Sequence, residues 1–283
     1  SGLVIVTGLS GSGKTTTLAA LIEYANQHFS RRIVTLEDPI EIIFHSQRSV
    51  ITQRQIGEDA HSFSSALKHV MRQNPDIVMI GEFRDAATIA AALTAGETGH
   101  LVFTTGHAPS APLAIDRIIN LFPPEQQTEV RSQLVNVLEA VIYQALLPKK
   151  GGVGRVLAAE VMLGTTAVRN LIRDRALHQL PGAIQLGQSQ GMISFDDSVL
   201  ALYKNGLITD EVALAACRDR ERAERAVSTP LTAQRINGHS HTNGVMSGAV
   251  LRPIEQLSVS SQPGCERGSS DSKDVSQDEV QNA

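Results

Sequence analysis

The sequence predicts an α/β fold with a mostly parallel sheet, followed by a small helical subdomain. Three observations support this prediction. Short apolar runs recur between longer stretches of helical composition, the pattern of strands that alternate with helices around a parallel sheet. A glycine-rich loop joins the first apolar run to the first helical stretch. After the last apolar runs, the remaining pattern is helical.

Four short apolar runs are predicted as strands, and two stretches between them as helices. The first helical stretch follows the glycine-rich loop, and the second ends at Asn74 and Pro75, residue types that terminate helices. Later in the chain, a GlyGlyValGly turn separates two apolar runs and predicts a β-hairpin. The predicted strands are residues 3–7, 33–36, 77–80 and 101–104, the predicted helices are 15–25 and 64–73, and the predicted hairpin pairs 141–147 with 155–162.

The region after the hairpin divides into a helical part and a polar part. Ser194, with Asp197 three residues later, resembles a helix cap, and residues 206–211 are typical of a break between two short helices. Beyond about residue 228 the composition is polar and without periodicity, which predicts disorder. The predicted units are a core over residues 1–164, a helical subdomain over 165–227 and a disordered tail over 228–283.

Composition points to an ordinary soluble protein. The chain has 283 residues, of which 42% are hydrophobic, and a net charge of −4, so it has no long-range positive field and we expect no nucleic-acid partner. Cys217 and Cys265 are too few for a zinc knuckle or a disulfide framework, which favours a reducing compartment. No apolar run approaches about 18 residues, and no secretory signal opens the chain. We expect a cytoplasmic protein that reaches a membrane only through partners.

The chain begins at Ser1 without an initiating methionine and enters an apolar run within two residues. We therefore expect further sequence upstream.

The glycine-rich loop carries the strongest functional signal. Residues 8–15 fit GxxxxGK[S/T], with a strand-like run before them and a helix-like run after them. In such a loop the glycines let backbone N–H groups turn toward phosphates, the lysine reaches the β and γ phosphates, and the hydroxyl after it binds Mg²⁺. The alternative is a glycine-rich turn that matches by chance. The predicted ligands are ATP and Mg²⁺, and the predicted nucleotide-binding residues are Ser10, Gly11, Ser12, Gly13, Lys14, Thr15 and Thr16.

Two acidic segments are candidates for hydrolysis. The strand 77–80 leads to Glu82, which is placed to hold the metal or its water shell together with Thr15. The strand 33–36 leads to a second acidic segment in which Pro39 fixes a bend, and Glu41 is the candidate for activating the attacking water. A solvated strand end and a plain charged loop are the respective alternatives.

Two histidines, His100 and His107, bracket the run 101–106. A neutral imidazole there can sense the γ-phosphate or bridge to a neighbouring subunit, although a histidine at a strand end is also often structural.

Together these segments resemble the secretion and type IV pilus ATPase superfamily, and most closely its pilus retraction branch. The matching segments are GlySerGlyLysThrThrThr (11–17), LeuGluAspProIleGlu (36–41), GlyGluPheArgAsp (81–85) and ThrGlyHisLeuValPhe (98–103) followed by His107. The resemblance implies a RecA-like P-loop NTPase core, Glu41 as catalytic base, Glu82 as a metal-supporting catalytic residue, and His100, His107 and Arg84 near the γ-phosphate or at the subunit contact.

Residues 167–174, AlaValArgAsnLeuIleArgAsp, are similar to a signature of the retraction branch. By itself this segment predicts only an amphipathic helix with Val168, Leu171 and Ile172 packed inward. The absence of a four-cysteine zinc set also favours that branch. The signature residues are Arg169, Asn170, Leu171, Ile172 and Arg173.

The resemblance further implies a homo-hexamer that powers pilus retraction and binds an inner-membrane pilus platform protein at the inner face of the cytoplasmic membrane. It also implies an upstream PAS-like domain that supplies arginines to the neighbouring subunit's nucleotide. Within this sequence Arg72, Arg84 and Arg117 are candidates for charge stabilisation, with a structural salt bridge as the equal alternative for each. Residues 106–109 depart from the family, because GlyHisAlaPro stands where family members have LeuHisThrAsn.

Two other functions are compatible with these residues. One is a nucleotide-binding subunit with little turnover that modulates a partner motor, which the altered 106–109 loop suggests. The other is a secretion or conjugation ATPase of the same fold that works on DNA, against which the acidic balance speaks.

Overall fold

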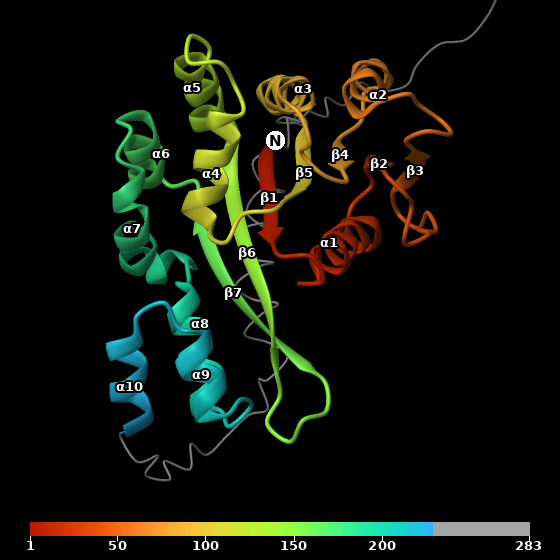
Figure 1. Ribbon diagram of the computed structural model, residues 1–283. Helices are drawn as coiled ribbons and strands as arrows, with labels where there is room; N and C mark the ends of the chain where they lie inside the picture. Colours follow the sequence, from red (N-terminus) through yellow and green to blue (C-terminus); the bar gives the residue numbers. More distant parts are fainter. Residues whose placement is uncertain (229–283) are drawn as a thin grey trace, which may run out of the picture.

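The computed structural model describes residues 1–228, which are built around a seven-stranded sheet of order β3-β2-β4-β5-β1-β6-β7 (Figure 1). Adjacent strands pair in parallel, apart from β6 and β7, which form the predicted antiparallel hairpin. The predicted α/β class with a mostly parallel sheet is therefore confirmed. The strands are β1 (Gly2–Gly8), β2 (Arg32–Glu37), β3 (Val50–Gln55), β4 (Ile77–Ile80), β5 (Leu101–Gly106), β6 (Leu138–Pro148) and β7 (Arg155–Leu163).

Helices follow most of the strands and cover both faces of the sheet (Figure 1). Within residues 1–228 they are α1 (Lys14–His28), α2 (Phe63–Val70), α3 (Ala86–Glu97), α4 (Ala111–Asn120), α5 (Gln127–Val137), α6 (Thr166–Arg173), α7 (Leu180–Leu186), α8 (Phe195–Lys204), α9 (Asp210–Ala216) and α10 (Arg220–Ser228), with 3₁₀ turns η1 (Met71–Gln73), η2 (Leu177–Gln179) and η3 (Gly187–Gln190).

Alternation along β1 shows how the sheet divides the core into two layers. Leu3 and Ile5 pack into a cluster with α2 to α7, whereas Val4 and Val6 pack into a cluster with α1 on the opposite face. Because successive side chains of a strand point to opposite faces, a strand that is apolar throughout must be covered on both sides. β1 is buried along its whole length, as this arrangement requires.

A third cluster joins α8, α9 and α10 to the far part of the β6–β7 hairpin. Figure 1 shows the hairpin running well beyond the other strands, with these three helices beside it. Tyr143 of β6 and Phe195 of α8 meet edge to face, with ring centroids 5.1 Å apart, a favourable geometry for aromatic pairs. The long hairpin thus connects the sheet to the last helices of the described chain.

The structure agrees with the sequence interpretation at most elements and adds one strand to it. The predicted helix over 64–73 is α2 continued by η1, and Asn74 ends it in the left-handed region with φ of 48°. The Oγ of Ser194 accepts a hydrogen bond from Asp197 N at 3.2 Å, which confirms that cap. The break before α9 is also confirmed. β3 was missed, because its polar residues from Thr52 onward hide the strand pattern.

The predicted boundaries fall at element ends. Residue 164 lies between β7 and α6, and Val168 and Ile172 of α6 join the same core cluster as α3 to α5. The division at 164/165 stays a prediction. The predicted tail, 228–283, lies outside the described residues except for Ser228, which ends α10.

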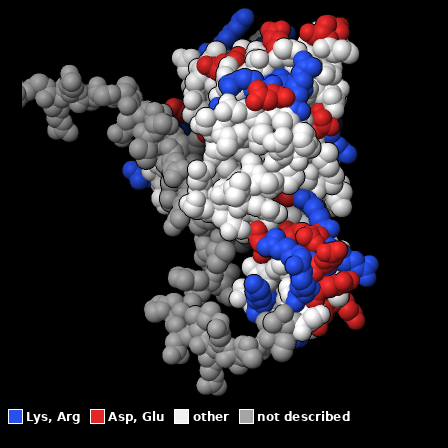
Figure 2. All heavy atoms as spheres, turned by 90° about the vertical axis from the view of Figure 1, so that its left-hand side faces the viewer, with Lys and Arg blue, Asp and Glu red and all other residues white. Residues whose placement is uncertain are grey.

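The surface that faces the viewer in Figure 2 belongs to the side of the molecule that carries α6, α7 and α10 (Figure 1). Charged side chains gather at its upper and lower parts and leave a broad uncharged centre. Leu186 at the end of α7 is 88% exposed. Among residues 1–228, no helix has both the length and the apolar character needed to cross a bilayer.

We predict that Gly164→Ala destabilises the fold by about 2–4 kcal/mol. A Cβ at Gly164 would lie 1.9 Å from the carbonyl oxygen of Leu138, so the chain between β7 and α6 would have to move. The matched control is Gly182→Ala in α7, where an added Cβ meets nothing within 4 Å. Because alanine favours the helix over glycine, we expect this control to raise the free energy of unfolding by about 0.5–1 kcal/mol. Urea unfolding of the two variants measures the difference. Equal stability of Gly164→Ala and the parent would contradict the packing described here.

Candidate nucleotide-binding site

The candidate site lies where the carboxyl ends of β1, β2, β4 and β5 meet. Parallel pairing of β1 with β5, β5 with β4 and β4 with β2 brings the loops after these strands to one edge of the sheet. A cavity of about 270 Å³ opens there. Residues from the glycine-rich loop, both acidic segments and the second histidine line it: Ser10, Gly11, Lys14, Thr15, Leu18, Glu37, Asp38, Pro39, Glu41, Phe63, Met79, Gly81, Glu82, Arg84, Thr105 and His107.

The glycine-rich loop has a backbone that side chains would obstruct. At Gly8 an added Cβ would lie 2.4 Å from the carbonyl oxygen of Gln144 and 2.6 Å from the Oγ of Ser12. Gly11 and Gly13 have φ of 75° and 89°, in the left-handed region that favours glycine. The loop can therefore turn tightly against β6 and present its N–H groups to a ligand.

Lys14 and the first N–H groups of α1 place positive charge beside this loop. The Nζ of Lys14 donates to the carbonyl oxygens of Gly8 at 3.0 Å and Leu9 at 3.1 Å, and burial lowers the pKa of Lys14. In the described structure no side chain caps α1, so its first N–H groups face the cavity edge without a side-chain acceptor. The buried Oγ of Ser12 also has no hydrogen-bond partner among the described residues. The free N–H groups at the start of α1 fit a phosphate chain.

Glu82 sits at the centre of a small charged cluster. Its carboxylate pairs with the Nε of Arg84 and lies 3.2 Å from the Nε2 of His107. Burial, followed by the charges of Lys14, Arg117 and Arg84, lowers the pKa of His107, so the neutral imidazole is favoured and its N–H can donate to Glu82. The structure thus brings together Glu82, Arg84 and His107, three of the residues predicted for hydrolysis and sensing.

The second acidic segment approaches the same cluster from β2. Arg84 links the segments, since its Nη1 lies 2.7 Å from the Oδ2 of Asp38. Glu37 is buried and accepts hydrogen bonds from Thr35 at 2.6 Å and from Gln53 at 3.1 Å. Glu41 is exposed and lines the cavity. This arrangement leaves Glu41 in contact with solvent, where it can meet a water molecule.

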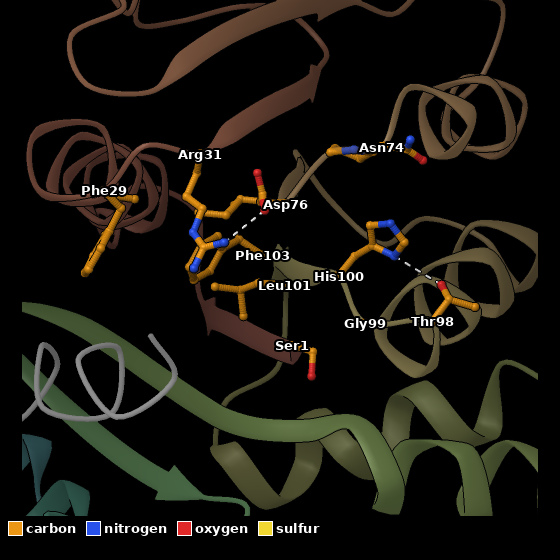
Figure 3. A pocket seen from close by; sticks show the side chains of 13 residues that line it. Ser1, Phe29, Arg31, Asn74, Asp76, Thr98, Gly99, His100, Leu101 and Phe103 are labelled. Atoms are coloured by element: carbon orange, nitrogen blue, oxygen red, sulfur yellow. Dashed lines mark hydrogen bonds and ion pairs between the residues drawn. The ribbon is translucent and has the colours of Figure 1, made fainter. Parts of the chain in front are cut away.

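The two histidines stand at opposite ends of β5. His100 precedes the strand, and its Nδ1 lies 3.1 Å from the Oγ1 of Thr98, in a separate pocket with Ser1 and Asp76 (Figure 3). Six residues of strand separate it from His107, roughly 20 Å at the rise of an extended chain. Within one chain, His100 is not near the phosphate loop, which corrects that expectation. A bridging role toward a neighbouring subunit stays a prediction.

Of the predicted phosphate-binding residues, Ser10, Gly11, Lys14 and Thr15 line the cavity. Ser12, Gly13 and Thr16 belong to the loop or the first turn of α1 but do not line it.

Sequence reasoning did not identify the polar side chains that hold the two acidic segments. The Oγ1 of Thr105 donates to the carbonyl oxygen of Gly81 at 2.5 Å, and the Oε1 of Gln55 accepts from Ile40 N at 3.0 Å. Gln53 and Gln55 both belong to β3. The β-branched residues at the start of β3 are the sequence signal that could have identified this strand.

The cavity offers oxygen donors of the kind that Mg²⁺ binds. Thr15, Glu41 and Glu82 offer one hydroxyl and two carboxylates at the cavity, and among residues 1–228 no cluster of three or more His, Cys, Asp or Glu side chains forms a self-contained metal site. Mg²⁺ usually takes one or two carboxylates together with phosphate oxygens and water. The residues therefore fit Mg²⁺ that arrives with a nucleotide.

The predicted signature at 169–173 lies in α6, away from this cavity. Val168 and Ile172 are buried as expected, and Leu171 is partly buried against the core. Arg169 has a structural task that the sequence did not reveal. Its guanidinium donates to the carbonyl oxygens of Gly164, Val135, Asn136 and Leu138, at 2.6, 2.5, 2.7 and 2.7 Å respectively. It thereby joins α6 to the end of α5.

Comparison with known proteins finds a matching family model and several similar relatives. Residues 1–179 match the family model described as type II/IV secretion system protein. The chain is 49% identical over 212 residues to the type IV pilus retraction ATPase PilT of Pseudomonas aeruginosa, covering 75% of this chain and 61% of that protein. It is 45% identical over 220 residues to a twitching motility protein of Neisseria gonorrhoeae, covering 78% and 59%. The chain thus spans about three fifths of the length of these relatives.

A solved structure of the pilus retraction motor PilT with bound ADP is also similar. The similarity covers 79% of this chain and 63% of that one, with 46% identity and a TM-score of 0.73. The X-ray structure of the Legionella pneumophila ATPase DotB is similar over 76% and 59%, with 27% identity and a TM-score of 0.69. These likenesses confirm the RecA-like P-loop core.

We predict that Arg169→Ala lowers the free energy of unfolding by about 2–4 kcal/mol, because four carbonyl oxygens lose a charged donor. Arg173→Ala is the control on the same helix, since Arg173 donates to the side chain of Asn170, and we expect it to change stability by less than about 0.5 kcal/mol. Thermal and urea unfolding measure both. Similar losses for the two variants would show that the contacts of Arg169 are not specific.

Proposed function

Because this chain belongs to the type II/IV secretion system protein family, we propose that it is an ATP-hydrolysing subunit of a hexameric motor that retracts a type IV pilus. The observation that carries this proposal is one cavity at the carboxyl edge of the sheet, shared by the phosphate loop and both acidic segments. The 49% identity to a pilus retraction ATPase supports retraction as the work performed.

The residues divide the task by position. The loop N–H groups and Lys14 bind the phosphates, and the N-terminal end of α1 favours their negative charge. The hydroxyl of Thr15 and the carboxylate of Glu82 hold Mg²⁺, which when bound neutralises charge on the phosphate oxygens. One carboxylate oxygen of Glu82 contacts Arg84 and the other contacts His107, so a bound metal would compete with these contacts.

Glu41 is proposed to orient the attacking water and accept its proton. Its exposed carboxylate lines the same cavity as the phosphate loop, and a carboxylate next to bound water can act as a general base. If a metal were held by Glu82, Arg84 and His107, which line the same cavity, would be available to contact the terminal phosphate. This exchange of partners is the proposed sensing step.

Partners and location follow from the same family relationship. We propose that six copies assemble, that each nucleotide is completed by arginines of a neighbouring subunit, and that the ring docks on an inner-membrane pilus platform protein at the cytoplasmic face. The chain alone is therefore expected to bind ATP and to hydrolyse it weakly. Salt-dependent DNA binding would instead favour the DNA-processing alternative.

A second candidate function has a specific observation behind it. Glu82 is paired with Arg84 and contacts His107, so these two side chains compete with a metal ion for the carboxylate of Glu82. If those contacts persist with nucleotide bound, the chain is a binding subunit that modulates a partner motor. Tight ATP binding without phosphate release in the assembled protein would favour this second function.

Turnover of site variants tests the proposal. We expect Lys14→Ala to abolish ATP binding and turnover, whereas Glu41→Gln and Glu82→Gln keep binding and lose roughly 10²- to 10³-fold in kcat, since each removes one catalytic group. Glu58→Gln, at an exposed position that does not line the cavity, is the charge-matched control. Phosphate release and fluorescent-nucleotide binding measure the two properties. Unchanged turnover in Lys14→Ala would end the ATPase proposal.

Assembly is checked independently of chemistry. We expect light scattering of the protein, extended to the length of its relatives, to give the mass of six subunits when ATP and Mg²⁺ are present. Lys14→Ala should assemble less well, because the nucleotide that stabilises the ring is not held. A monomer at all concentrations, with full turnover, would contradict the ring.

A further inference from the structure

The loop that carries His107 has few side chains to hold it in place. Residues 106–110 run from β5 to α4, and Ala108 and Pro109 offer no polar side-chain groups. The loop is therefore positioned through its backbone. Ala108 N donates to the Oγ1 of Thr7 at 2.7 Å, and Arg117 donates to the carbonyl oxygen of His107.

Arg218 supplies a further contact to this loop from a distant part of the chain. Its Nη2 donates to the carbonyl oxygen of Pro109 at 2.9 Å, and its Nη1 pairs with the carboxylate of Glu160 in β7. The guanidinium also lies over the rings of Tyr143 and Phe195, 5.2 and 5.1 Å from their centroids. A planar, always charged group held by two rings and two acceptors has little freedom to turn.

Glu160 connects the same pair to the start of α4. Its side chain is 4% exposed, and its Oε1 accepts a hydrogen bond from Ala111 N at 2.7 Å. A buried carboxylate requires such partners. Because Arg117 of α4 donates back to the carbonyl oxygen of His107, two routes lead from the Arg218–Glu160 pair to His107.

At its other end, Arg218 is anchored to the last helices. It lies between α9 and α10, and the carboxylate of Asp196 in α8 accepts hydrogen bonds from Arg218 N at 2.8 Å and Asp219 N at 2.9 Å. These hydrogen bonds link the position of Arg218, and of the Pro109 carbonyl oxygen that accepts from its guanidinium, to α8.

We infer that Arg218 is a positioning residue for the proposed reaction: it holds the 106–110 loop, and through it the ring of His107, in place beside Glu82. This inference rests on the proposed function for its effect on turnover. The inferred role of Arg218 also means that the position of α8 to α10 affects the nucleotide site. Arg218 touches none of the reacting groups itself.

The test compares Arg218→Lys with Arg222→Ala in the full chain. Lysine keeps a cation for Glu160 but cannot span Pro109 and both rings, whereas Arg222 pairs with Asp197 of α8 and does not contact the loop. We expect amide hydrogen exchange in a peptide covering 106–115 to be at least several-fold faster in Arg218→Lys, and unchanged in Arg222→Ala. Equal exchange in the parent and Arg218→Lys would overturn the inference.

Turnover in a double-variant cycle separates positioning from general damage. In the parent, Arg218→Lys should lower kcat about tenfold and leave KM for ATP within about twofold; in a His107→Ala background it should cause little further loss. An equal loss in both backgrounds would mean that Arg218 does not act through His107. No turnover in the parent would count against the proposed function, and the exchange comparison would then decide this inference alone.

Discussion

The parallel pairing of β2, β4, β5 and β1 is the constraint on which the rest of the site depends. Each of these strands ends at the same edge, so their loops meet there although they lie far apart in sequence. The close approach of Gly8 to the backbone of Gln144 adds β6 to this edge. A side chain at Gly8 would push the phosphate loop away from the sheet and from Glu82.

Charge at this edge is arranged independently of the charge of the whole chain. The net charge is −4, yet the pKa of His107 is lowered by burial and then by the nearby charges of Lys14, Arg117 and Arg84. These cations suit a polyphosphate ligand, and the same cavity also carries the carboxylates of Glu37, Asp38, Glu41 and Glu82. Arg84 contacts both Asp38 and Glu82 and so joins the two acidic segments.

The long β6–β7 hairpin gives the last helices a mechanical connection to this edge. Its near part belongs to the sheet, and its far part packs against α8, α9 and α10 (Figure 1). Arg218 and Glu160 join those helices to the loop after β5. Under the role inferred for Arg218, the position of these helices affects the loop that carries His107 through these contacts.

Local pattern was enough to determine the phosphate loop, the buried strands and the hairpin. Gly8 to Thr15 and the apolar runs around them are contiguous, and their physical requirements act within a few residues. Contacts between segments distant in sequence were decided only by the tertiary structure. β3 is stabilised by pairing with β2, so its own composition did not mark it, and the length of β5 carried His100 away from the site. Arg169 and Arg218 bind carbonyl oxygens, which every residue possesses and which no sequence pattern can distinguish.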